Sequence, residues 1–163
     1  MVTTALTKEQ VLGWLSEIAD PEIPVVSIQE MGMLRDVNIT GDACEVLLTP
    51  TYTGCPAMGI IEADIKALLH EKGVANATVK MIYQPAWTTD WMTDEAKEKM
   101  RRYGISPPVH SGCGDIFKAE QHVSCPKCGS EDTAVVSRFG STACKALYKC
   151  NTCHEPFEYF KCH

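Results

Sequence analysis

Two cysteine pairs near the end of the chain place the tightest limit on its fold. The stretch CPKC carries Cys125 and Cys128, and CNTC carries Cys150 and Cys153, with 21 residues (129–149) between the pairs. A Cys-x-x-Cys turn presents two thiolates on one side, and two such turns can complete a tetrahedral metal site. The spacing therefore predicts a zinc ribbon in which these four cysteines bind Zn²⁺.

The segments around these pairs have strand composition. TAVVSRF, ACKALYKC and EPFEYFKC predict three strands, so we expect the ribbon to span 123–163. A segment of roughly 40 residues cannot bury a sufficient core, so the metal is expected to be structural. Four thiolate ligands leave no open coordination position for catalysis. Rubredoxin-like iron is the alternative metal.

Further potential ligands surround the ribbon. The chain has nine cysteines, an odd number, and late Cys-x-x-Cys pairs without a secretory signal favour metal ligands over disulfides. Cys144 lies in a strand pattern and is expected to be a packed thiol. His110 and Cys113 have ligand spacing but no matching second pair. The remaining residues receive no assigned role: Cys162, His122, His154 and His163.

Residues 1–83 predict a small α+β domain in the order α-β-β-α-β. TKEQ at 7–10 is a capping box for a first helix, which must end by Asp20 because Pro21 follows. Gly41 and Asp42 suit a two-residue hairpin turn between two strands. ATVKMIY, near the end of the domain, alternates apolar and polar residues as a strand does.

The second helix is expected to begin near Cys55, with Pro56 at its first position and Gly73 at its end. Residues 84–122 then predict a connector with one short helix. Trp87, in this connector, is expected to pack on its own domain rather than to bind a partner.

Composition excludes several classes of function. The net charge of −6 argues against general affinity for nucleic acids or acidic membranes. The N-terminal MVTTALTKEQ lacks the features of a signal peptide, and no apolar run approaches about 20 residues. We therefore expect a cytoplasmic protein with no membrane segment.

Cys55, in TPTYTGCPAM, has three possible roles. At the start of a helix, free amides and the helix dipole are expected to lower the pKa of its thiol, which suits a thiolate that handles metal. Alternatively, it is a small residue that fills a crowded corner. The third possible role is that of a catalytic nucleophile. Such a nucleophile needs a positioned base, and this role is poorly supported because His70 lies about 22 Å further along the same helix.

Two stretches resemble the SufT-like domain family associated with iron–sulfur cluster assembly. They are DPEIP at 20–24 and LLTPTYTGCPAM, and the resemblance covers roughly residues 7–83. It implies that Asp20 and Glu22 lie near Cys55, in a patch that handles iron or a cluster or that binds a partner. On the sequence alone, the two acids could also be a helix-ending Asp and a solvated Glu.

Further stretches resemble the D subunits of the bacterial phenylacetyl-CoA epoxidase system, and this likeness runs over nearly the whole chain. The matching stretches are PAWTTDWMTDEAKEKMRRYGISPP, CPKCGS, FGSTACKALYKC and PFEYFK. This resemblance implies an accessory protein of phenylacetate degradation that assists metal or iron–sulfur maturation, or the assembly, of oxygenase or reductase subunits. Transient iron or a cluster would then be handled beside structural zinc.

Other sequence features agree with an accessory role. The chain has no Glu-x-x-His pair of the kind that di-iron bundles use, and no complete G-x-G-x-x-G loop. No catalytic activity of its own is expected. Two alternatives stay open: an effector or structural subunit that binds the oxygenase during turnover, and a thiol-dependent enzyme that uses Cys55.

Overall fold

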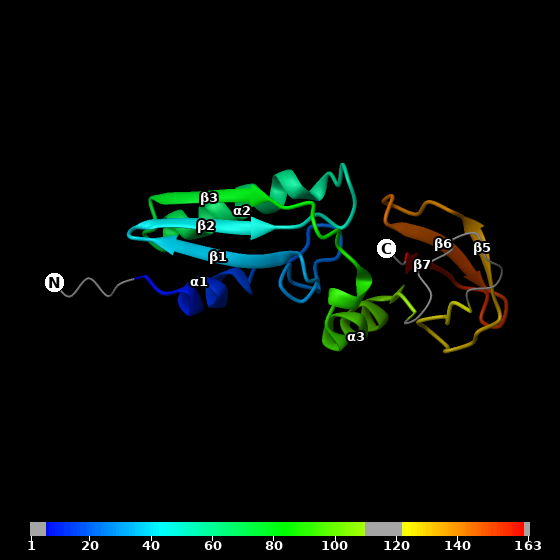
Figure 1. The fold of residues 1–163 in the computed structure, drawn as a ribbon. Helices are drawn as coiled ribbons and strands as arrows, with labels where there is room; N and C mark the ends of the chain where they lie inside the picture. The colour runs from blue at the N-terminus through cyan, green and yellow to red at the C-terminus, as the bar shows by residue number, and fades with distance from the viewer. Residues whose placement is uncertain (1–5, 110–121, 162–163) are drawn as a thin grey trace. The chain divides into compact units, whose positions relative to one another are not determined.

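The chain forms two compact units, with the division after Trp87 (Figure 1). The computed structural model describes residues 6–109 and 122–161. His110, Cys113, Cys162 and His163 lie outside the described residues.

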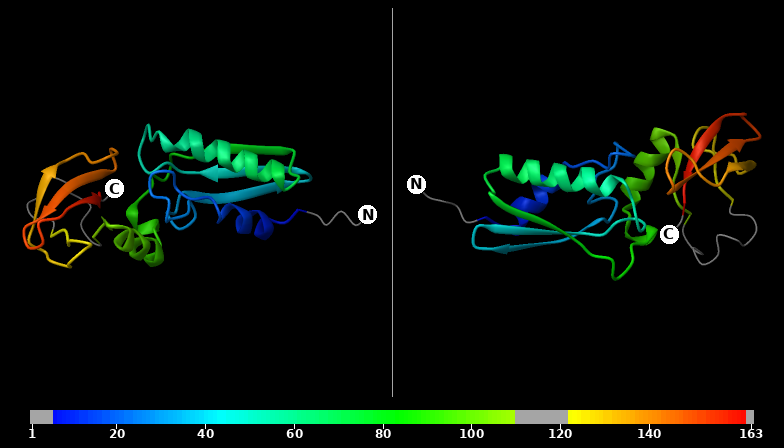
Figure 2. Two further views of the ribbon diagram at one scale, coloured as in Figure 1. Left: turned by 180° about the vertical axis from the view of Figure 1, so that it is seen from behind. Right: turned by 90° about the horizontal axis from the view of Figure 1, so that it is seen from above.

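The first unit has the predicted order α-β-β-α-β. Its elements are α1 (Lys8–Leu15), β1 (Leu34–Thr40), β2 (Ala43–Leu48), α2 (Ala57–Glu71) and β3 (Asn76–Met81). β2 is the central strand, antiparallel to β1 and parallel to β3. Both helices lie on one face of this sheet, as the view from above shows (Figure 2).

Local signals set the boundaries of several elements in this unit. Thr7 Oγ1 accepts the Gln10 amide at 3.3 Å, and the Gln10 side chain accepts the Thr7 amide, which completes the predicted capping box. The β1–β2 hairpin turns through two residues, with Gly41 at φ +64°. The first helix ends at Leu15, well before Asp20. Ile18 lies after the helix, in irregular backbone, and its side chain is buried there.

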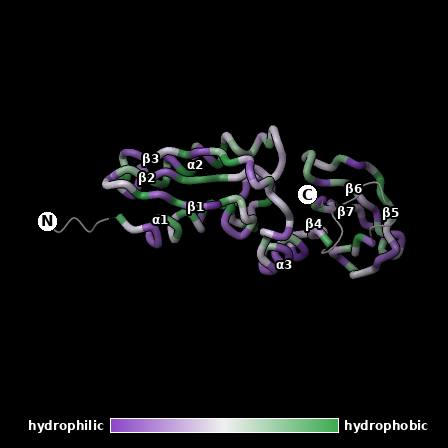
Figure 3. The backbone as a smooth tube through the Cα atoms, viewed as in Figure 1, coloured by the Kyte–Doolittle hydropathy of each residue, from purple (hydrophilic) through white to green (hydrophobic). Residues whose placement is uncertain are grey.

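In its described residues, the second unit contains one α-helix, one short 3-10 helix and a four-stranded sheet. Its elements are η1 (Thr89–Trp91), α3 (Asp94–Tyr103), β4 (Ile105–Ser106), β5 (Thr133–Ser137), β6 (Lys145–Cys150) and β7 (Pro156–Phe160). The strand order is β4-β7-β6-β5, so β5 lies at one edge of the sheet. The hydropathy colouring shows α3 as largely hydrophilic (Figure 3).

The segment expected to be a connector, 84–122, contributes to both units. The indole Nε1 of Trp87 donates to the Met31 carbonyl at 2.9 Å, and the side chain is buried in the first unit. The helix α3 and the strand β4 belong to the second unit, where β4 pairs in parallel with β7. None of the helices in the described ranges has the length and apolar character needed to cross a bilayer.

Candidate metal centre and the Cys55 site

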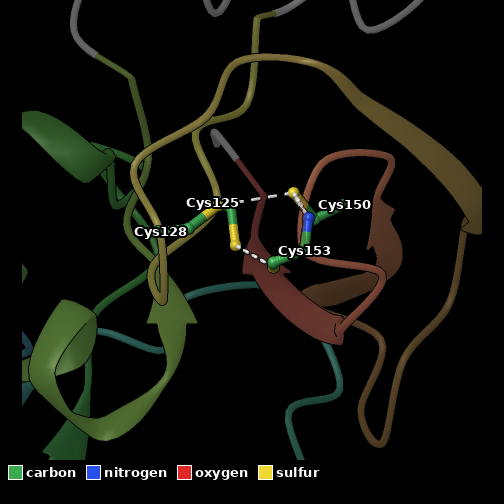
Figure 4. A group of neighbouring side chains, drawn as sticks. All are labelled: Cys125, Cys128, Cys150 and Cys153. Atoms are coloured by element: carbon green, nitrogen blue, oxygen red, sulfur yellow. Dashed lines mark hydrogen bonds between the residues drawn. The ribbon is translucent and has the colours of Figure 1, made fainter.

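Four cysteine sulfurs converge in the second unit, as Figure 4 shows. All four Sγ atoms lie within 4.8 Å of one another; they belong to Cys125, Cys128, Cys150 and Cys153. The pair 125–153 is 3.7 Å apart and the pair 128–150 is 3.6 Å apart. Tetrahedral Zn–S bonds of about 2.3 Å place sulfurs about 3.8 Å apart. The donor set and its spacing therefore fit a tetrahedral metal ion.

Two turns of similar shape hold these sulfurs. In the first, the Gly129 amide donates to the Cys125 carbonyl at 2.9 Å. In each turn, the residue after the second cysteine has a left-handed backbone: Gly129 at φ +75° and His154 at φ +63°. Glycine adopts this conformation freely, whereas a histidine there is strained. His154 therefore occupies the left-handed backbone position of the second turn, and it is not among the converging ligands.

The pKa values of Cys150 and Cys153 are shifted in opposite directions. The Cys153 amide, 3.4 Å from the sulfur of Cys150, is the main cause that lowers the pKa of Cys150 to about 6. For Cys153, the Glu155 amide lowers the pKa, but burial and the neighbouring thiolate of Cys150 outweigh it and raise the pKa to about 12. Once one thiolate has formed, the next is opposed by like charge. A divalent ion removes that repulsion.

Two of the converging cysteines are also part of the core of this unit. The buried cluster consists of Val123, Cys125, Ala146, Cys150, Phe157 and Tyr159. Two of its six members are thus candidate ligands, while Cys128 is exposed. Cys144 is buried outside the converging group, as expected of a packed thiol.

Cys55 is the second candidate site, in the first unit. It lies two residues before α2, which begins at Ala57 with Pro56 as its N-cap, one residue later than predicted. The prediction of a lowered thiol pKa is wrong. Burial raises the pKa of Cys55; the Ala57 amide and the Thr51 hydroxyl lower it, but Glu22 and Asp20 raise it further. Burial and negative charge outweigh the helix terminus.

The same interactions place the two acids close enough to Cys55 to affect its ionisation. Asp20 is 6% exposed, and its Oδ1 accepts the amides of Glu22 at 2.8 Å and Ile23 at 2.9 Å. Asp20 therefore organises the 20–23 turn and does not end α1. In the described part of the chain, only one group of three or more Cys, His, Asp or Glu side chains brings its ligand atoms together, and that group is the four ribbon cysteines. Cys55, Asp20 and Glu22 thus do not form a complete metal site.

Sequence reasoning missed two threonines that precede Cys55. Thr51 is buried, and its hydroxyl affects the thiol of Cys55. Thr49 is 1% exposed, and its Oγ1 has no hydrogen-bond partner in the described structure. The only signal for them was their position, since Thr49 directly follows the last residue of β2 and Thr51 lies two residues later.

Two family models match this chain. The model described as "Iron-sulfur cluster assembly protein" matches residues 8–80, and "PaaD zinc beta ribbon domain" matches residues 111–161. The first match contains Cys55 and both acids, and the second contains all four converging cysteines. The division between the models agrees with the two kinds of site.

Individual relatives show the same division. The chain is 47% identical to a putative D subunit of 1,2-phenylacetyl-CoA epoxidase from Escherichia coli K12, over 94% of this chain and 92% of that protein. It is 35% identical to an Fe-S protein maturation auxiliary factor of Bacillus subtilis, over 55% of this chain and 89% of that protein. A solved conserved hypothetical protein from Thermotoga maritima is similar, with a TM-score of 0.52 and 31% identity. That likeness covers 61% of this chain and 98% of the other.

Proposed function

Because this chain belongs to the family of the D subunits of phenylacetyl-CoA epoxidase, we propose that it is an accessory component of the phenylacetyl-CoA 1,2-epoxidase system. In this proposal it assists metal or iron–sulfur maturation, or the assembly, of the oxygenase or reductase subunits, and has no turnover of its own. One observation carries the proposal: a single chain joins an iron–sulfur assembly domain to a PaaD-type ribbon.

The ribbon supplies a structural metal site in this proposal, and the metal is zinc. The four cysteines would hold Zn²⁺ as thiolates, and the ion would replace the apolar burial that so small a unit lacks. The close fit of the sulfur spacing to tetrahedral thiolate coordination supports this assignment.

The Cys55 site is the proposed place of iron or cluster handling. Its thiol lies half-buried beside two carboxylates, and all three groups are ligand types that iron accepts. A cation would favour the thiolate that burial and negative charge now oppose. Since the three groups do not converge, ligands from the recipient subunit would complete the coordination, which suits transfer better than storage.

The test is to produce the oxygenase and reductase subunits with and without this chain, and to measure their iron content. The proposal predicts iron-poor subunits when the chain is absent, and when it carries Cys55→Ala. Cys44→Ala is the matched control, because Cys44 is the other cysteine of the first unit and is buried in β2. It should leave iron loading intact.

A second arm separates the alternatives. Purified chain is added to oxygenase and reductase that already contain their full metal complement, and phenylacetyl-CoA epoxidation is measured. Stimulation of turnover there, with normal iron content in its absence, would replace the maturation role with that of an effector subunit. A reaction catalysed by the chain alone and abolished by Cys55→Ala would instead indicate a thiol-dependent enzyme.

A further inference from the structure

One edge of the ribbon carries exposed apolar side chains that its own core does not use. Val135 is 57% exposed, Val136 is 59% exposed and Phe139 is 66% exposed. They lie on β5 and directly after it, and β5 is an edge strand of its sheet. The β5 edge, defined here as residues 133–139, thus combines apolar surface with a strand that has a neighbour on one side only among the described strands.

A bulge at the two valines interrupts the regular alternation of side chains along β5. Val135 pairs with Tyr148 and Ser137 with Leu147, so Val136 is the extra residue between them. Tyr148 packs against the ribbon core, which places Val135 on that side of the sheet. Both valines are exposed, and an extended segment beside β5 would run along them while pairing with the open edge of the strand.

The charge within the hairpin that contains this edge has one sign, whereas the two residues directly before it, Glu131 and Asp132, are acidic and exposed. The hairpin 133–150 contains Arg138, Lys145 and Lys149 and no acidic residue, although the whole chain has a net charge of −6. The remaining residues therefore carry −9, since −6 minus +3 is −9. Lys145 is buried and pairs with Glu158 at 3.0 Å, whereas Arg138 and Lys149 are exposed at the surface of the hairpin.

A third cation, Lys161, lies beside Arg138 and Phe139 at the end of the β5 edge. Lys161 Nζ donates to the Arg138 carbonyl at 3.1 Å and lies 4.6 Å from the ring centre of Phe139. Charge complementarity therefore favours an acidic partner, and the apolar edge favours one with apolar side chains between its acids.

We propose that the β5 edge binds an extended, acidic and apolar segment of an epoxidase subunit as an added strand. The proposal rests on the function proposed above and extends it to the ribbon, for which no more than metal binding was inferred. Main-chain pairing along β5 would supply affinity, and the valines and cations would select the segment. Because the bulge shortens the regular edge, we expect micromolar affinity, which suits a transient assembly contact.

Binding of the full-length zinc-loaded chain to each purified oxygenase and reductase subunit tests this proposal. We expect Val136→Asp and Arg138→Glu each to weaken binding to one subunit by about tenfold or more, and added salt to weaken the wild type. Lys80→Glu is the matched charge reversal, at an exposed position on β3 of the first unit, and should change affinity less than twofold. Zinc content checks that each variant keeps its fold.

Hydrogen exchange on the wild-type complex supplies the second measurement. An added strand predicts slower amide exchange within 133–139 when the subunit binds. Equal affinity of all variants, or unchanged exchange at this edge in a formed complex, overturns the added strand and leaves the accessory function standing. Failure of the wild-type chain to bind any epoxidase subunit overturns both the proposed partner and the added strand.

Discussion

The two units of this chain are stabilised in different ways. Among the described residues, ten of the twelve largest fully buried side chains belong to the first unit, including Leu15, Ile61 and Ile65. In the second unit the buried ribbon cluster has six members, and two of them are cysteines of the metal group. The first unit has a conventional apolar core, whereas the ribbon core is partly made of its candidate metal ligands.

The difference shows how one chain can combine a stable scaffold with a metal-dependent module. Burial of apolar surface stabilises the first unit whatever metal is present. Under the proposed zinc assignment, the ribbon gains its stability when thiolates and ion assemble, so its folding should follow metal supply and pH. The four predictions below test this contrast, from the largest expected effect to the smallest.

Removal of one ligand should unfold the ribbon alone. Cys128→Ser takes away a thiolate at an exposed position of the cluster. Since structural zinc contributes on the order of 10 kcal/mol of apparent binding free energy, we expect loss of bound zinc and of ordered structure across 122–161. Metal analysis and amide NMR spectra measure both.

The matched control for this variant is Cys144→Ser, because Cys144 is buried in the same unit but lies outside the ligand group. It should retain one zinc ion per chain. Loss of zinc from both variants, or from neither, would contradict the assigned ligand set.

Truncation of an apolar core side chain in the first unit should destabilise that unit and leave the ribbon folded. Ile65 is fully buried on α2, so Ile65→Ala is expected to destabilise the first unit by about 2–5 kcal/mol. Lys66→Ala, at the next and exposed position, should cost little. Urea unfolding followed by circular dichroism reports the loss, and zinc release into an indicator dye should be unchanged. Earlier zinc release from Ile65→Ala would mean that the units unfold together.

A buried ion pair at the ribbon hairpin should have a smaller effect. Lys145 is 4% exposed and pairs with Glu158, which also accepts the Ser141 amide at 2.6 Å. Glu158→Gln leaves the ammonium without its counter-charge, and we expect a loss of about 1–3 kcal/mol, because Glu158 is still a quarter exposed. Glu155→Gln, in the exposed pair with Lys127, should change little.

This loss should depend on pH with a defined sign. Burial tends to raise the pKa of Glu158, but the Ser141 amide and Lys145 outweigh it, so the pKa lies below its usual value. The stabilisation is therefore complete above about pH 4.3, the ordinary glutamate value, and is lost as the pH falls through the folded pKa. The difference between wild type and Glu158→Gln should shrink in that window. A constant difference would show that the side chain acts through its shape alone.

The smallest predicted effect concerns the two cysteine turns. His154→Gly relieves a left-handed backbone, and we expect a gain of about 0.5–1 kcal/mol in the ribbon. Gly129→Ala introduces the same strain at the equivalent position of the first turn and should destabilise by a similar amount. The urea concentration at which zinc is released measures both. Shifts of the same direction would contradict the equivalence of the turns.

Signals within a few residues made much of the fold predictable. The capping box at Thr7, the glycine turn at Gly41 and the order of strands and helices follow from contacts between near neighbours. The convergence of the four candidate ligands was predictable because Cys-x-x-Cys geometry is itself local, and the sulfurs of the two pairs lie together as expected.

The remainder depends on contacts between distant segments. The thiol pKa of Cys55 is raised because its burial and two acids from another loop outweigh the nearby helix terminus. The pairing of β4 with β7 joins residues more than 50 positions apart, so the pattern around Ile105 gave no indication of it. The unpartnered Thr49 hydroxyl likewise shows only when its surroundings are known.

The most direct test of the contrast is hydrogen exchange on the full-length chain, with reduced thiols, before and after zinc is removed by a chelator. Our account predicts that amides in β5, β6 and β7 lose protection, that amides in α2 and the β1–β2–β3 sheet keep it, and that added zinc restores the ribbon. Continued protection of the ribbon without metal, or loss of protection in both units together, would contradict the account.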